Sequence, residues 1–486
     1  MKAIVFHGIG DIRLDDVSEP KLRKPDDSIV RLTASAICGT DLHMVRGTFS
    51  GMEPGTILGH EGVGIVEEVG KGVRNISRGE RVVIPSTIAC GYCSYCRSGY
   101  YAQCDHANPN GPSAGTAFFG GPADTGPFDG LQAEFARVPL SPVGLVKLPP
   151  NVTDDQAILI SDIFPTGYFG VDIAEIEAGD TVVVFGCGPV AQFAIASAKL
   201  MRAGRIFAVD CIPSRLEMAK AQGAEVINFN AEDPIEALKE LTGGIGVDRA
   251  IDAVGIDAVQ PETGPAAEKE RSLRQEFAAE VGKIAPGQHP DGKNWVPGNA
   301  PSQVLLWAVD ALAKAGTLSI IGVYPPTART FPIGKAMNKN LTVKMGNCNH
   351  RKYIPTLVDL VANGTVDPLK ILTQREPLMS ALDAYRAFDT RQPGWVKVEL
   401  TLGSQSIPSA EDVGRDDMQQ MVVETKGTPD SAATGNLGKA LEQIPGVSSV
   451  DLGTSTGIAI VKHRNANREE VLRAVKSAGY PDASVR

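Results

Sequence analysis

The chain has 486 residues, a length that predicts about two to four domains. Its hydrophobic fraction of 43% and charged fraction of 21% are ordinary for a soluble globular protein. A net charge of -10 and a pI near 5.4 disfavour nucleic acid and anionic membranes as partners, since both attract basic surfaces. The acidic N-terminus, MKAIVFHGIGDIRLDD, is unlike a secretory signal, and no apolar run reaches the roughly 18–20 residues that cross a bilayer. We therefore expect a cytoplasmic protein that binds neither nucleic acid nor membrane.

Short apolar runs, broken by glycine and proline, fill the first part of the chain. They include KAIVF, IVRLTAS, GVGIVEEVG, RVVIP and AEFARVP, with almost no long helical period. This texture predicts a β-rich, barrel-like domain over residues 1–165.

Strand and helix patterns alternate in the next part. The run TVVVFG, PVAQFAIASAKLMRA, RIFAVD, PSRLEMAKAQGA and EVINF is followed later by the strands DRAIDAV and TLSIIGV. Such alternation predicts a Rossmann-type, doubly wound parallel sheet over residues 166–340. A polar insert at about 260–301 interrupts it, and a lid, an oligomer contact and a flexible loop all remain open for this segment. Residues 341–402, which end in the strand WVKVELTL, are expected to return to the first domain.

The C-terminal part has its own pattern. Residues 403–418 are polar and acidic and are typical of a linker. Residues 419–486 follow a β-α-β-β-α-β order, which predicts a ferredoxin-like α+β domain. The whole chain is therefore expected to be of the α/β class, with this small domain appended.

Four of the eight cysteines lie close together, in the run CGYCSYCRSGYYAQC. Cys90, Cys93, Cys96 and Cys104 have the spacing C-x2-C-x2-C-x7-C. Four thiolates complete the tetrahedron of a structural zinc and leave no place for a substrate. Unrelated thiols or an iron–sulfur cluster are the alternatives. We expect a structural zinc.

Three dispersed residues suggest a second metal site. Cys38 lies in AICGTDLH, His60 in LGHEGVG and Asp162 in LISDIFPTGY. One thiolate, one imidazole and one carboxylate leave the fourth position of a zinc ion open for water or substrate, as a catalytic zinc requires. Each residue alone is weak evidence for a metal site, and the prediction depends on the three motifs occurring together.

A glycine-rich turn between a strand and a helix indicates a dinucleotide site. In TVVVFGCGPVAQFAIASAK, Gly186 permits the tight turn and Gly188 the close approach of a pyrophosphate at the helix N-terminus. Asp210 ends the next strand, where a carboxylate accepts ribose hydroxyls and favours NAD over NADP, although Arg215 nearby weakens that preference. The expected cofactor-binding residues are Gly186, Gly188, Pro189, Val190, Asp210 and Arg215.

These motifs together resemble the zinc-dependent medium-chain alcohol dehydrogenase family, over about residues 1–402. CGTDLH, GHEGVG, the four-cysteine run and GCGPVA all match its pattern. The resemblance implies that Cys38 and His60 are catalytic zinc ligands. Asp162 stands where many members have cysteine, and its setting resembles the branch of glutathione-independent formaldehyde dehydrogenases and formaldehyde dismutases.

The same resemblance implies roles for three further residues. Thr40 would take the proton of the substrate hydroxyl, and His43 would pass it towards solvent. For His43, contact with a cofactor phosphate is the alternative. Glu61 is similar to a family glutamate that lies near the metal and exchanges onto it. A structural carboxylate behind the ligands is the alternative for Glu61.

The C-terminal part resembles heavy-metal-associated domains, notably in ALEQIPGVSSVDL and EEVLRAVKSAGY. The loop KGTPDSAATGN lacks the cysteine pair that such domains use for soft metals, so metal transfer is not expected. Docking, oligomerisation and regulation remain open.

Taken together, the sequence predicts a dehydrogenase with two zinc ions per chain and NAD. It would oxidise formaldehyde, free or as a thiol adduct, or a small alcohol, by hydride transfer from an alkoxide on the zinc. The alternatives are a general primary or benzyl alcohol dehydrogenase and a formaldehyde dismutase that retains its NAD. A non-catalytic protein on the same scaffold is disfavoured, because all three constellations are intact. The resemblance also implies a homo-oligomer, either a dimer or a tetramer.

Overall fold

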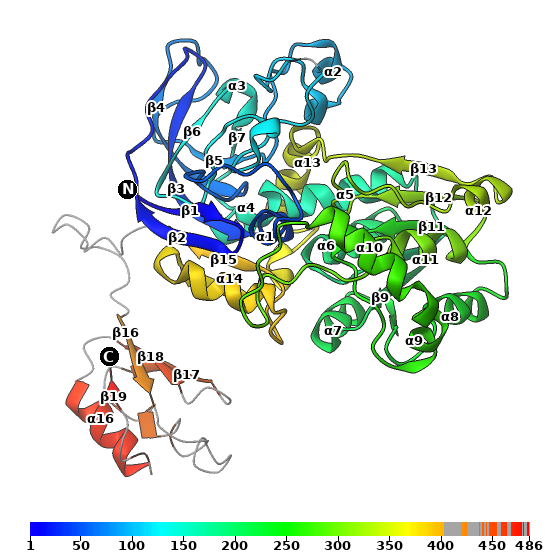
Figure 1. Cartoon of the computed structure of the whole chain (residues 1–486). Helices are drawn as coiled ribbons and strands as arrows, with labels where there is room; N and C mark the ends of the chain where they lie inside the picture. The colour runs from blue at the N-terminus through cyan, green and yellow to red at the C-terminus, as the bar shows by residue number, and fades with distance from the viewer. Residues whose placement is uncertain are drawn as a thin grey trace. The chain divides into compact units, whose positions relative to one another are not determined.

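The computed structural model describes two compact units, Met1–Gly403 and Ser404–Arg486 (Figure 1). No helix in the part of the chain that the structure describes is long and apolar enough to cross a membrane. The predicted domain boundaries within these units stay predictions. The described residues are 1–111, 113–402, 419–424, 437, 440–441, 444, 447–453, 458–463, 468–478, 480 and 484–485.

A seven-stranded, mostly antiparallel sheet forms the core of the first domain. Its order is β14-β15-β3-β4-β5-β7, with β6 paired to β3, and β1 and β2 form a separate hairpin. Buried β-branched and aliphatic residues fill these strands, as the short apolar runs predicted. The strands are β1 (Lys2–Gly8), β2 (Asp11–Asp16), β3 (Ser28–Ile37), β4 (Gly62–Val69), β5 (Arg81–Ile84), β6 (Phe135–Val138), β7 (Val146–Lys147), β14 (Gln374–Pro377) and β15 (Val398–Thr401).

Chain segments that are far apart in sequence meet in this sheet. β15 pairs antiparallel with β3, with Val398 opposite Ile37. Figure 1 shows β15 and α14, in yellow, beside the blue N-terminal strands. The last residues of the first unit therefore lie next to the strand that leads to Cys38.

Local signals place the helices next to the expected metal ligands. Cys38 caps α1 (Gly39–Arg46), and its backbone N–H donates to the side chain of Asp41 over 2.9 Å. Thr153 and Gln156 form a capping box at the start of α4 (Asp154–Ser161). Asp162 separates α4 from α5 (Ile163–Ile173) with φ -142° and ψ -63°, so the carboxylate lies at a break between two helices. The remaining helices and 3-10 turns of this domain are α2 (Ser94–Arg97), η1 (Tyr101–Gln103), η2 (Ala123–Thr125), α3 (Ser141–Gly144), α13 (His350–Ala362), η5 (Pro368–Ile371), η6 (Leu378–Ser380) and α14 (Ala381–Asp389).

The second domain contains a six-stranded sheet in the order β10-β9-β8-β11-β12-β13, with every pair parallel. This confirms the Rossmann prediction. Helix α5 packs on α6, where Phe164 stacks on Phe193 at 4.5 Å. The elements are β8 (Thr181–Phe185), α6 (Pro189–Leu200), β9 (Arg205–Asp210), α7 (Pro213–Ala221), β10 (Glu225–Asn228), α8 (Pro234–Leu241), β11 (Val247–Asp252), η3 (Gly255–Asp257), α11 (Gln303–Ala311), β12 (Leu312–Ile320), α12 (Ile333–Asn338) and β13 (Thr342–Met345).

The polar insert is folded. It contains α9 (Gly264–Lys269), the 3-10 turn η4 (Glu270–Leu273) and α10 (Arg274–Ile284). Near its end Trp295 is buried, and its backbone N–H donates to Asp389 of the first domain over 2.7 Å. Of the three possibilities for this segment, a flexible loop is therefore not what the structure shows.

The second unit contains a four-stranded antiparallel sheet in the order β17-β18-β16-β19 and the helix α16 (Arg468–Ser477). The predicted linker 403–418 and most of the helix expected between β16 and β17 lie outside the described residues. The ferredoxin-like assignment therefore stays a prediction. The strands are β16 (Gln419–Glu424), β17 (Val447–Gly453), β18 (Ile458–His463) and β19 (Ser484–Val485).

Candidate active site

Cys38, His60, Glu61 and Asp162 form one buried cluster in which a ligand atom of each lies within 4.8 Å of the others. Cys38 follows β3, His60 and Glu61 directly precede β4, and Asp162 lies at the break between α4 and α5. Cys38 Sγ lies 3.6 Å from Asp162 Oδ2, and His60 Nε2 lies 3.5 Å from the same oxygen. The three dispersed residues predicted as metal ligands are therefore brought together.

The spacing of these atoms fits a zinc ion. Tetrahedral zinc with bonds of about 2.0–2.3 Å holds neighbouring ligand atoms roughly 3.3–3.8 Å apart. Burial raises the pKa of the Cys38 thiol and the charge of Asp162 raises it further, so without a cation the thiolate is disfavoured. His60 Nδ1 lies 3.2 Å from Asp41 Oδ1, so a buried carboxylate stands behind the imidazole.

Asp162 is held by residues that sequence reasoning did not single out. Its Oδ1 atom lies 2.8 Å from His350 Nε2 and accepts a hydrogen bond from Ser86 Oγ at 2.9 Å. Thr87 Oγ1 lies 3.1 Å from His350 Nδ1. Burial acts to raise the pKa of Asp162, but the hydrogen bond from His350 and the charge of His60 hold it well below its usual range. With Oδ1 engaged in this way, Oδ2 faces the cluster.

Glu61 forms a fully buried ion pair. Lys397 Nζ donates to Glu61 Oε1 over 2.5 Å and to the carbonyl oxygen of Ile37 over 3.2 Å. Burial raises the pKa of Glu61 to about 7, against the opposing charge of Lys397. Its second oxygen, Oε2, has no hydrogen-bond partner among the described residues. A buried, unpartnered carboxylate oxygen beside the other ligands suits a cation.

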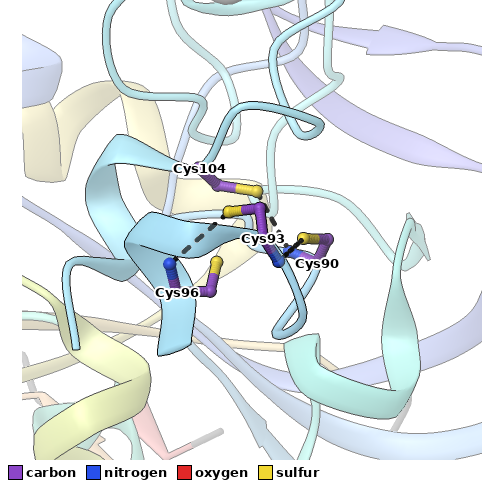
Figure 2. Close-up of side chains that lie close together, drawn as sticks. All are labelled: Cys90, Cys93, Cys96 and Cys104. Atoms are coloured by element: carbon purple, nitrogen blue, oxygen red, sulfur yellow. Dashed lines mark hydrogen bonds between the residues drawn. The ribbon is translucent and has the colours of Figure 1, made fainter. Parts of the chain in front are cut away.

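The four clustered cysteines form a second site. Their sulfur atoms lie within 4.8 Å of one another, and Figure 2 shows the side chains turned towards a common centre. Backbone N–H groups of Cys93 and Cys96 donate to the sulfur atoms of Cys90 and Cys93 at 3.4 Å, and the N–H of Cys90 donates to Cys104 Sγ at 3.2 Å. Such bonds stabilise thiolates, so the arrangement fits a closed zinc site.

Thr40 and His43 both line the cavity above the cluster. Thr40 Oγ1 lies 4.0 Å from Cys38 Sγ. His43 is buried, with Nδ1 2.9 Å from Thr48 Oγ1 and Nε2 3.9 Å from Asp257 Oδ2. Burial lowers the pKa of His43, although the charge of Asp257 acts to raise it. A neutral imidazole at this place can accept a proton.

The glycine-rich turn has the conformation that a dinucleotide site requires. Gly186 has φ +87°, and a Cβ atom there would meet Val254 at 2.6 Å. A Cβ atom on Gly188 would meet only the guanidinium of Arg215, at 3.7 Å, so it would occupy open space of the cavity. Asp210 accepts the backbone N–H of Cys187 at 2.7 Å, which ties the end of β9 to the turn.

One cavity of about 790 Å³ joins the two predicted sites. Its lining includes the three metal ligands at one end and Gly186, Gly188, Pro189, Val190, Asp210 and Arg215 at the other. A ligand that extends from the Rossmann turn to the metal cluster therefore lies within a single enclosure.

Known proteins share this architecture. Residues 24–150 match the alcohol dehydrogenase GroES-like domain, and residues 189–263 match the zinc-binding dehydrogenase family. The chain is 37% identical to the zinc-type alcohol dehydrogenase-like protein AdhB of Bacillus subtilis over 404 residues, which are 82% of this chain and 100% of AdhB. The chain belongs to the zinc-containing medium-chain alcohol dehydrogenase family. Zinc, one of the predicted cofactors, is confirmed at the level of this family, and the second domain has the Rossmann fold typical of NAD(P)-binding proteins.

Two further relatives provide information on the fold of this chain and on its similarity to the formaldehyde dehydrogenase branch of the family. The solved structure of the alcohol dehydrogenase TADH from Thermus sp. ATN1 is 33% identical, has a TM-score of 0.67 and covers 83% of this chain and 100% of TADH. This confirms the predicted fold of the first unit. The glutathione-independent formaldehyde dehydrogenase of Pseudomonas aeruginosa is 36% identical over 331 residues, which are 66% of this chain and 80% of that enzyme.

Ser86, Thr87, His350 and Lys397 of this site were missed in the sequence, although His350 and Lys397 each have a weak signal there. His350 follows the motif KMGNCN and is the first residue of an amphipathic helix. Lys397 interrupts the apolar strand WVKVELTL, where a lysine predicts a buried partner of opposite charge. Neither signal identifies the partner, because Asp162 and Glu61 are far away in sequence.

Proposed function

We propose that the protein is a zinc-dependent, NAD-linked dehydrogenase whose substrate is formaldehyde, free or as a thiol adduct. The observation that carries the proposal is the single cavity that contains both the Cys38–His60–Asp162 cluster and the Gly186–Asp210 region. Similarity to a formaldehyde dehydrogenase and the carboxylate at the third ligand position support the substrate class.

The cofactors and the residues around them would have different roles in this reaction. Cys38, His60 and Asp162 would hold the zinc, which when bound would supply a Lewis acid, and NAD would supply the hydride acceptor. Thr40 accepts the proton of the substrate hydroxyl at Oγ1 while its own proton passes towards the neutral imidazole of His43. Glu61, neutralised by Lys397, adds a further oxygen beside the ligands.

The substrate end of the cavity favours a small molecule. Phe49 and Phe118 line it and pack edge to face at 6.2 Å, and Phe118 packs in the same way against His60 at 6.4 Å. Ile163 adds an aliphatic wall next to Asp162. Apolar side chains therefore lie beside the metal position, and we propose that they favour a small substrate such as formaldehyde hydrate or a small alcohol.

We propose NAD rather than NADP as the cofactor. Asp210 occupies the end of β9, 6% exposed, and its two oxygens accept the backbone N–H groups of Cys187, Cys211 and Ile212. A carboxylate fixed in this way repels a 2′-phosphate.

The test is NADH formation by the purified, zinc-loaded protein with formaldehyde, with and without glutathione, beside primary and benzyl alcohols. Formaldehyde turnover supports the proposal, and a requirement for glutathione identifies the thiol adduct as the substrate. Turnover of alcohols alone would contradict it in favour of a general alcohol dehydrogenase. Equal amounts of formate and methanol, with no free NADH, would identify a dismutase that retains its NAD.

A further inference from the structure

We infer that Gln303 recognises the amino group of the adenine base, so that the cofactor site reads the base of the dinucleotide as well as its ribose. This inference rests on the proposed binding of NAD. The contact would be made by the side-chain amide of Gln303, at the start of α11. Glu270 of the insert accepts a hydrogen bond from this amide and positions it.

The cavity continues beyond Asp210 in the direction that the adenine must take. If Asp210 binds the adenosine ribose, the base lies on the far side of this carboxylate from the pyrophosphate turn. That part of the cavity is lined mainly by apolar side chains, which suit the flat faces of a base. They are Ile212, Phe229, Val259, Val304 and Trp307.

Gln303 contributes a polar side chain to this apolar part. It lines the cavity, is 1% exposed, and its Oε1 atom has no hydrogen-bond partner among the described residues. A buried carbonyl oxygen without a partner is unfavourable unless a ligand or water supplies a donor. The exocyclic amino group of adenine is such a donor, and glutamine is among the side chains that pair with adenine in nucleic-acid recognition.

Glu270 fixes which end of the amide faces the cavity. Its Oε1 atom accepts a hydrogen bond from Gln303 Nε2 at 2.9 Å and another from Trp307 Nε1 at 2.5 Å. An ionised carboxylate only accepts hydrogen bonds, so Nε2 of the Gln303 amide faces Glu270 and Oε1 faces away from it. Glu270 lies in η4, and the insert therefore acts as a positioning element for the base contact.

This orientation predicts discrimination between two bases of almost the same shape. Nicotinamide hypoxanthine dinucleotide carries a carbonyl oxygen where NAD carries the amino group. Two acceptors would then face each other in a buried site, and we expect binding to be weaker by about tenfold or more.

Isothermal titration of the zinc-loaded full chain with each dinucleotide tests the inference without turnover. The wild type is expected to prefer NAD by about tenfold or more. In Gln303→Met, which keeps the length of the side chain, the two dissociation constants should become similar. Gln288→Met, at an exposed position of the insert, is the matched control and should keep the preference.

Glu270→Gln provides a second variant. Its amide can donate to Gln303 Oε1, so the Gln303 amide can rotate and present Nε2 to the cavity. The preference should then fall or reverse towards the hypoxanthine dinucleotide, which a merely structural role of Glu270 would not produce. NAD and its analogue binding equally to the wild type, or an unchanged preference in Gln303→Met, would overturn the inference alone. Failure of the wild type to bind NAD at all would overturn the proposed function, and this inference with it.

Discussion

His350 Nε2 lies 2.8 Å from Asp162 Oδ1, so an imidazole from the first residue of α13 supports a carboxylate at the break between α4 and α5. The remaining oxygen, Oδ2, lies 3.6 Å from Cys38 Sγ and 3.5 Å from His60 Nε2. The orientation of the third ligand therefore depends on a residue 188 positions away in the chain.

We predict that His350→Ala weakens zinc binding at the catalytic site by about 10- to 100-fold, since loss of a partner behind a ligand has this effect in other metal sites. His350→Gln keeps a hydrogen-bond donor and should recover part of the affinity. Competition with a chelator measures the affinity, and the cobalt-substituted spectrum reports the ligand geometry. His289→Gln, at an exposed position, is the control. An unchanged affinity in His350→Ala would show that Asp162 is oriented without it.

The Glu61–Lys397 pair should be strongly coupled, because both side chains are completely buried. Lys397→Met leaves Glu61 buried without its partner, and we expect the free energy of unfolding to fall by about 3–5 kcal/mol. Glu61→Gln in the same chain should restore a large part of the loss. Urea unfolding of the wild type, both single variants and the double variant gives the coupling energy. If the two substitutions change the free energy of unfolding additively, Glu61 and Lys397 are not energetically coupled.

Removal of one thiolate should separate the two zinc sites. Cys104→Ser is expected to lower the zinc content from about two ions per chain to about one, because a structural site needs all four ligands. The segment 90–104 should then become sensitive to protease. NAD binding should persist, since no residue of this segment lines the cavity in the described chain. Zinc analysis and limited proteolysis are the measurements, and loss of both zinc ions would contradict the independence of the sites.

Stability should fall on acidification partly because of His43. Burial lowers its pKa below the ordinary value near 6.5, so the unfolded chain binds a proton more readily than the folded one. The free energy of unfolding therefore decreases as the pH falls below about 6.5. His43→Gln removes the titrating group and should reduce this decrease. Urea unfolding at about pH 7.5 and about pH 5.5 tests this, and an equal decrease in both proteins would contradict it.

Features whose parts lie close together in the chain could be predicted from the amino-acid sequence. The Cys90–Cys104 run and the glycine-rich turn at Gly186 are local, and their spacing is the geometry that a tetrahedral zinc or a pyrophosphate requires. The alternation of strands and helices likewise determined the parallel sheet, because each buried strand must be covered by helices. The dispersed ligands Cys38, His60 and Asp162 could be proposed only from their combined motifs.

The residues that complete the metal and dinucleotide sites from distant parts of the chain could be identified only in the folded structure. His350 reaches Asp162, Lys397 reaches Glu61, and Glu270 orients Gln303, and each pair joins different elements of the fold. The insert that the sequence left open is likewise defined by contacts such as that between Trp295 and Asp389. Two buried polar side chains become partners only when the elements that carry them pack together. Local propensity and motif spacing contain no information on which elements pack together.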